Sequence, residues 1–97
     1  MYVAFTDVQL QPDRIDTVRE LFEETNPGLV ADQDDWISAK FTADYDTDRV
    51  TVMAFWRDAN AYRRFSESKQ FRQVMSQFAP HFAAPPEVRI HKVLFEM

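Results

Sequence analysis

Four side chains of this sequence could do acid–base or hydrogen-bonding chemistry: Asp7, Tyr62, His81 and His91. Asp7 falls in an otherwise apolar stretch, where a carboxylate costs free energy unless it is paired or hydrated. If Asp7 faces a pocket, burial would raise its pKa and make it a general base. The alternative is a strand-end residue that meets solvent or a lysine. The Tyr62 hydroxyl could orient a substrate.

The two histidines are the only side chains whose unperturbed pKa lies near neutrality. His81 follows Pro80, and His91 lies inside a β-rich segment. They have no i, i+4 spacing and no accompanying carboxylate cluster, so they do not indicate a metal site. Either could deprotonate a phenol, or could instead lie at the surface or at an interface.

The acidic segment "DYDTD" resembles the start of a calcium loop, with acids at its first, third and fifth positions. Such a loop also needs glycine at position 6 and glutamate at position 12. Arg49 and Phe55 stand there instead. We therefore interpret residues 44–48 as a hairpin turn.

An aromatic and methionine-rich helix face could be either core or pocket lining, since both are apolar surfaces. We predict a substrate pocket lined by Phe5, Trp56, Phe65, Phe71, Met75 and Phe78. Trp56 ends a strand, so it could instead anchor the strand-to-helix corner or a dimer seam, and this structural role is the favoured interpretation. Trp36 could be a pocket lid or a dimer contact.

Composition excludes several classes of protein. The 97 residues make one domain, 45% of them hydrophobic, and a net charge of −5 disfavours nucleic acid as a partner. The single glycine excludes a phosphate-binding loop or a dinucleotide fingerprint. The sequence has no cysteine, which suits a reducing cytoplasm. We expect no signal peptide, because the N-terminal residues lack a basic region and a long apolar region, and no membrane span, because the apolar run "VTVMAFW" is far too short.

The apolar periodicity predicts how these residues are positioned. A first helix starts near Pro12 and ends at the "NPG" of residues 26–28, and a second starts at Asp58 and restarts at Ser68. Pro80 ends the second helix. The predicted strands span residues 2–9, 36–43, 50–56 and 88–95.

The order βαββαβ predicts an α+β, ferredoxin-like fold, a four-stranded antiparallel sheet with both helices on one face. The strands are apolar at many positions of both parities, so both faces of the sheet should be buried. The simplest cover is a second copy, which predicts a homodimer through sheet-to-sheet packing.

The segment "VTVMAFWRDANAYRRFSESKQFRQVMSQFAP" resembles the antibiotic biosynthesis monooxygenase (ABM) family of dimeric α+β barrels. The shared features are the strand ending in Trp56, the Arg57-Asp58 step, the Ala61-Tyr62 pair and the break at residues 68–71. "NPGLV" before the second strand matches as well. The resemblance covers nearly the whole chain.

The resemblance implies a pocket between sheet and helices, where enzymatic members oxidise aromatic compounds with O2 and no metal or flavin. A haem-degrading branch uses an Asn, a Trp and a His; the matching positions are Asp7, Phe65 and Met75, so haem degradation is set aside. We expect a cofactor-independent monooxygenase for a small phenolic or quinol-like substrate. The alternatives are a non-catalytic or stress-associated protein that binds a small apolar ligand, and a structural dimerisation domain.

Overall fold

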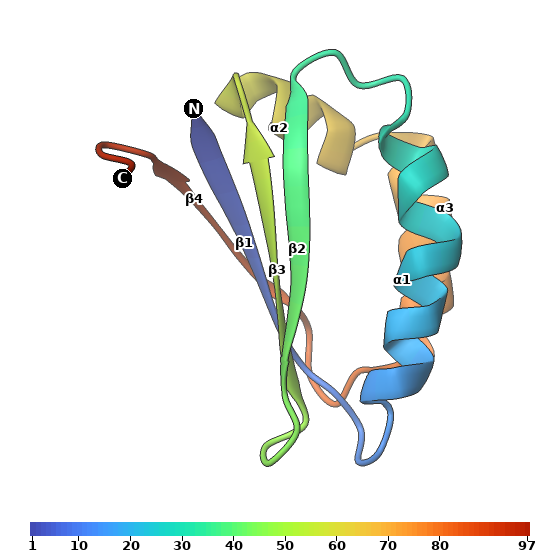
Figure 1. The fold of residues 1–97 in the computed structure, drawn as a ribbon. Helices are drawn as coiled ribbons and strands as arrows, with labels where there is room; N and C mark the ends of the chain where they lie inside the picture. The colour runs from blue at the N-terminus through green and yellow to red at the C-terminus, as the bar shows by residue number, and fades with distance from the viewer.

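The computed structural model describes residues 1–97 and has the predicted order of elements (Figure 1). The chain has four strands and three α-helices in the order β-α-β-β-α-α-β, and a short 3₁₀ turn precedes the last strand. Their bounds are β1 Tyr2–Gln9, α1 Ile15–Val30, β2 Trp36–Asp44, β3 Arg49–Trp56, α2 Ala59–Ser66, α3 Lys69–Phe78, η1 Ala79–His81 and β4 Glu87–Lys92. None of the helices combines the length and apolarity needed to cross a bilayer.

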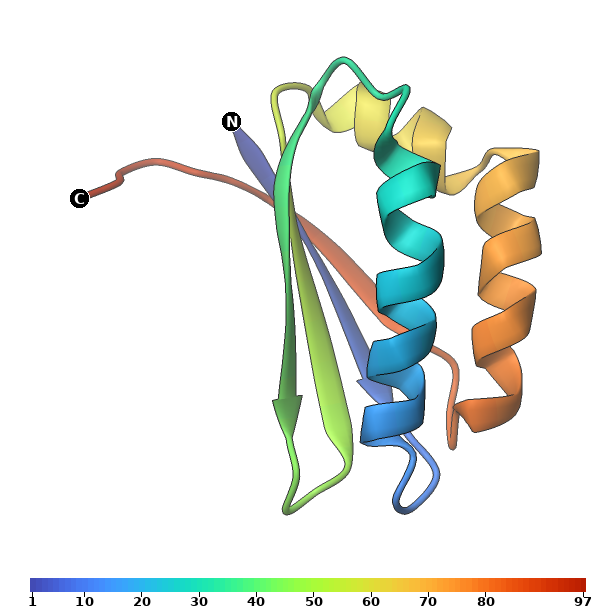
Figure 2. The same ribbon diagram turned by 45° about the vertical axis from the view of Figure 1, so that its right-hand side comes forward.

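The strands form one antiparallel sheet in the order β2-β3-β1-β4, which confirms the ferredoxin-like prediction. Helices α1 and α3 lie side by side against one face, here called the inner face (Figure 2). Even-numbered residues of β1 and β3 point to this face, since Ala4, Val8, Val50 and Trp56 belong to its buried core. The odd-numbered residues point to the opposite, open face.

The core between sheet and helices has two clusters. One joins the end of β1 to α1 and α3; its buried members are Val8, Leu10, Ile15, Val18, Val50 and Phe78. The other joins the opposite end of the sheet to α2; its buried members are Ala4, Trp56, Ala61, Tyr62 and Phe65. The space between these clusters contains the cavity described below.

Two predicted helix starts are confirmed by their capping hydrogen bonds. The Asp58 carboxylate accepts from the backbone N–H of Asn60 at 3.2 Å, and the Ser68 hydroxyl accepts from that of Phe71 at 3.2 Å. Each cap satisfies a helix N–H group that has no partner within the helix. The break at Ser68 lets α2 and α3 follow different directions.

The predicted end of the first helix at "NPG" is wrong. Helix α1 continues through Pro27 and Gly28 to Val30. Proline removes one intrahelical hydrogen bond, but Leu29 and Val30 pack against the second core cluster. This tertiary packing outweighs the local cost of the proline, because most helical stability in proteins comes from the buried face.

The last strand is also shorter than the predicted span of residues 88–95. It pairs with β1 only as far as Tyr2 opposite Lys92, and the N–H of Val93 then donates to the carbonyl of Met1. The pairing of β4 with β1 ends at this hydrogen bond. Residues 93–97 therefore continue as an extension on the open side of the sheet (Figure 2).

Candidate functional site

The core between the sheet and the helices contains two small chambers, each named here by one residue. The Phe78 chamber has a volume of about 80 Å³, and the Trp56 chamber about 60 Å³. Ten of the twelve residues around each chamber are hydrophobic. The two share five lining residues, which makes them neighbours: Thr6, Phe22, Asn26, Val52 and Phe71. Together we call them the inner cavity.

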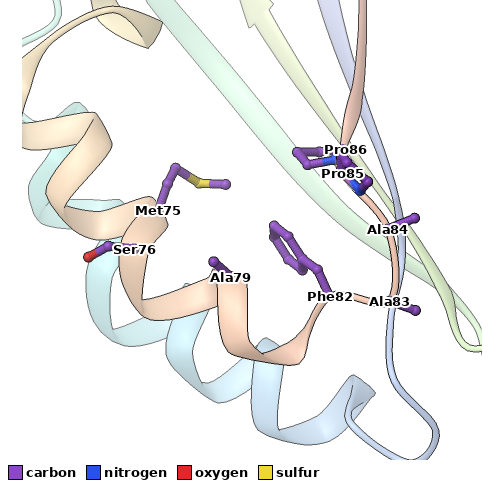
Figure 3. Close-up of a pocket in the computed structure, with 8 residues that line it drawn as sticks. All are labelled: Met75, Ser76, Ala79, Phe82, Ala83, Ala84, Pro85 and Pro86. Carbon is purple, nitrogen blue, oxygen red and sulfur yellow. The ribbon is translucent and has the colours of Figure 1, made fainter.

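A broad depression of about 600 Å³, the outer pocket, opens on the surface between α3 and residues 82–86 (Figure 3). It is lined by Met75, Ser76, Ala79, Phe82, Ala83, Ala84, Pro85 and Pro86. Met75 and Phe82 line both this pocket and the Phe78 chamber. These two side chains point into the space between α3 and the chain leading to β4 (Figure 3), so they form a wall that the outer pocket and the Phe78 chamber share.

Most of the predicted pocket residues do surround this cavity. Phe71 lines both chambers, Met75 and Phe78 line the Phe78 chamber, and Phe65 lines the Trp56 chamber. Trp36 also lines the Trp56 chamber. The aromatic face of the helices is therefore core and cavity wall at once.

Tyr62 lines the Trp56 chamber and is the one residue there with a phenolic hydroxyl. Tyr62 as a whole is 7% exposed. Burial raises the pKa of Tyr62, and a hydrogen bond with the Thr6 side chain acts weakly in the opposite direction. The phenol therefore stays protonated at neutral pH and can donate a hydrogen bond. Thr6 and Asn26 add an alcohol and an amide to the walls shared by both chambers.

Trp56 lies on the inner face and is 1% exposed, in edge-on contact with Tyr62 and tilted contact with Phe65. It packs at the corner from β3 to α2, as its favoured sequence interpretation requires, and it also lines the Trp56 chamber. Because Trp56 lies on the inner face, it is not on the sheet face that a dimer would use. Its Nε1 is buried without any hydrogen-bond partner.

Asp7 lies on the open face and not in the inner cavity. One carboxylate oxygen accepts from the Thr51 hydroxyl at 2.7 Å, and the other from the Arg89 guanidinium at 2.8 Å. The pKa of Asp7 is lowered, chiefly by the hydrogen bond from Thr51. The hydrogen bond and the positive charge of Arg89 act in the same direction, and together these effects outweigh partial burial, which raises the pKa. The raised pKa expected for a pocket-facing base does not arise.

Phe5 and His91 share the open face with Asp7. Their rings meet edge-on at 5.3 Å, and the Arg89 guanidinium lies 5.0 Å from the centre of the Phe5 ring. Phe5 is the one predicted pocket residue that lines neither chamber. Val3, Met53 and Phe55 point to the same face, so it is an apolar surface with a polar margin.

His81 sits in the 3₁₀ turn after α3, on the protein surface. Its Nδ1 accepts from the Arg14 guanidinium at 2.9 Å. The four residues predicted to do chemistry are thus separated. Tyr62 lines the inner cavity, Asp7 and His91 lie on the open face, and His81 lies in the turn that follows α3. No carboxylate or imidazole lines the inner cavity.

Sequence reasoning missed several residues that line the cavity. Asn26 was part of the predicted helix stop, and only the continuation of α1 places its amide against the shared wall. Phe82 follows the last helix and has no periodic partner, so no pattern assigns it to a pocket. Thr6 alternates with the buried Ala4 and Val8, and this parity was the one available signal.

The amino-acid sequence matches the profile of the antibiotic biosynthesis monooxygenase family over residues 1–77. The chain therefore belongs to the ABM family. A search of curated proteins found no significant match.

Solved structures share the fold at low sequence identity. A Bordetella bronchiseptica protein provisionally named an antibiotic biosynthesis monooxygenase is 17% identical, with a TM-score of 0.85 over 97% of both chains. Rv0793 from Mycobacterium tuberculosis is 16% identical, with a TM-score of 0.78 over 98% of this chain and 96% of its own. An antibiotic biosynthesis monooxygenase is 15% identical, with a TM-score of 0.78 over 97% of this chain and 99% of its own.

Proposed function

We propose that this protein oxidises a small, single-ring phenol or quinol with O2 in the inner cavity, without a metal or an organic cofactor. Membership of the ABM family supports the reaction class. The observation that carries the proposal is the apolar cavity whose lining includes three residues with polar groups, Tyr62, Thr6 and Trp56. The two chambers approach the roughly 150 Å³ of a protein cavity that holds benzene, which favours one ring.

The electrons in this reaction come from the substrate. A phenolate transfers an electron to O2, and the two radicals combine at a ring carbon that bears hydrogen, para to the oxygen in a simple phenol and ortho to it in a quinol, to give a peroxide that takes up a proton. Loss of the proton from that carbon breaks the O–O bond, so one oxygen atom enters the product as a quinone carbonyl and the other leaves as water. An apolar cavity suits this sequence because it excludes water from the intermediates.

The protein's part is to hold the ring and to donate hydrogen bonds to its oxygen. Tyr62, whose pKa is raised, remains a donor at neutral pH. Since no carboxylate or imidazole lines the cavity, the phenol loses its proton to water before it binds. The rate should therefore rise with pH up to the pKa of the phenol itself.

Oxygen uptake tests the proposal directly. Metal-free protein is assayed with single-ring quinols and with two phenols of different acidity, and a heat-inactivated sample corrects for autoxidation. We expect catalysed uptake whose pH midpoint follows the phenol used, and a loss of roughly 100-fold or more in kcat for Tyr62→Phe if one donor stabilises the oxyanion. Absence of uptake across the panel would reject the reaction.

A second candidate function is the binding of a small apolar ligand without turnover. The specific observation in its favour is the absence of a titratable base from the inner cavity. Calorimetric binding of a single-ring compound, with no oxygen consumed, would favour this function over the first. Oxygen consumption above the autoxidation control would exclude it.

We also infer that the chain forms a homodimer through the open face. Helices cover only the inner face, while Val3, Phe5, Met53 and Phe55 form an apolar surface on the other. Leu94 and Phe95, in the extension beyond β4, are 88% and 79% exposed. A sheet needs cover on each apolar face, and a second sheet supplies it most simply.

Small-angle scattering at micromolar concentration tests the dimer. A single chain has a radius of gyration of 13.3 Å. A compact pair should have about 16 Å, from the scaling of size with chain length. Phe55→Lys places a charge on the open face and should restore the smaller value, whereas Glu20→Lys, exposed on α1, should not. A monomer-sized wild type would refute the dimer.

A further inference from the structure

The indole N–H of Trp56 is the one buried side-chain polar group without a hydrogen-bond partner. Trp56 is also among the most deeply buried side chains, at 1% exposure. Leaving a buried donor unsatisfied costs about 1–3 kcal/mol, and native proteins nearly always supply a partner. The position of this donor therefore calls for an acceptor that the chain itself does not provide.

The surroundings of the ring narrow the choice of acceptor. Tyr62 and Phe65 contact the indole through their rings, at centroid distances of 5.7 and 5.1 Å. Asn26, on the same chamber wall, donates from its amide nitrogen to the Thr25 hydroxyl at 3.2 Å, and its amide oxygen makes no hydrogen bond with the indole. The indole borders the Trp56 chamber, and two of the residues on the walls of this chamber, Phe71 and Val52, also line the neighbouring Phe78 chamber.

We propose that Trp56 Nε1 is a specificity-determining donor that binds a carbonyl or quinone-type oxygen of a ring held in the inner cavity. The inference deepens the proposed function, because it rests on the same cavity. The ring would lie along the apolar wall shared by the two chambers, with its oxygen in the Trp56 chamber. An indole N–H only donates, so it selects ligands that present an acceptor.

Two ligands of the same shape isolate this contact. Acetophenone and α-methylstyrene differ only in having C=O or C=CH2 on the same ring. In a Trp36→Phe variant, Trp56 gives the only indole N–H resonance, and both compounds are titrated under anaerobic conditions. We expect acetophenone to move this resonance downfield and to bind roughly fivefold to tenfold more tightly, the size of one neutral hydrogen bond. The hydrocarbon should leave the resonance in place.

Trp56→Phe is the matched variant, because it keeps an aromatic ring at the corner and removes the donor. It should bind both compounds with equal affinity, and its circular dichroism and unfolding midpoint show whether it is folded. If it does not fold, the resonance and affinities of the Trp36→Phe protein decide alone. Equal affinities in that protein, an unmoved resonance, or no binding of either compound would overturn the inference and assign a buried water as the partner.

The outcomes separate this inference from the proposed reaction. Anaerobic binding of acetophenone with the expected shift, but no oxygen uptake with any phenol, would support the donor role and reject the monooxygenase. Oxygen uptake together with an unmoved Trp56 resonance would do the reverse.

Discussion

The substitution Val52→Ile tests whether the interior holds a cavity or is already filled. Val52 points inward from β3, between Phe41 of β2 and Thr6 of β1, and lines both chambers. The added methylene is smaller than a water molecule, whose share of liquid volume is about 30 Å³. The adjoining Phe78 chamber offers about 80 Å³. The methylene should therefore be accommodated without moving the backbone.

The sign of the stability change follows from this space. Burying one methylene stabilises by about 0.8 kcal/mol, whereas forcing it into a closely packed core costs about 1–3 kcal/mol. For a domain of this size the gain corresponds to a rise in Tm of about 3–6 °C. Because the methylene takes space from the ligand, the same variant should bind single-ring compounds less tightly.

Urea unfolding at neutral pH and one fixed protein concentration measures the change, and the fixed concentration keeps any dimer equilibrium constant. Val74→Ile is the matched control: Val74 packs against the first core cluster from α3 and lines neither chamber. We expect no gain in stability from it. A destabilisation of 1 kcal/mol or more by Val52→Ile, on the scale of overpacking, would refute the cavity and favour a filled, structural domain.

Three further perturbations test other parts of the structure. Because the pKa of Asp7 is lowered, its carboxylate stabilises the fold above the unfolded pKa, and this contribution is lost as pH falls through the folded pKa. Asp7→Asn should therefore cost about 1.5 kcal/mol at pH 7, near the lower end for hydrogen bonds to a charged group, and little in acid; equal losses in urea unfolding at both pH values would contradict this. Ser68→Ala should cost about 1 kcal/mol by removing an N-cap, whereas Ser76→Ala, inside α3, should cost less, and equal midpoints for the two variants would show that the cap contributes nothing. Phe82→Ala should speed ligand association in stopped flow by opening the wall between the outer pocket and the inner cavity; an unchanged association rate would mean that ligands enter elsewhere.

Local patterns determined most of the secondary structure. Strand β1 has its predicted bounds, and the capping residues Asp58 and Ser68 start helices where their side chains can accept an N–H. Alternation also assigned Asp7 and Phe5 to one face of the strand together. These features depend on residues close in sequence, so the sequence alone was sufficient to predict them.

Tertiary structure decided which face of the sheet the helices cover and which face stays open. Both parities of β1 and β3 are apolar, so alternation groups residues without showing which group the helices cover. The packing of α1 and α3 places Trp56 inside and leaves Phe5, Asp7 and His91 on the open face. The same packing carries α1 through Pro27, brings Asn26 to the cavity and leaves the Trp56 indole N–H without a partner. Each of these outcomes depends on contacts between elements distant in sequence, which local propensity and periodicity do not encode.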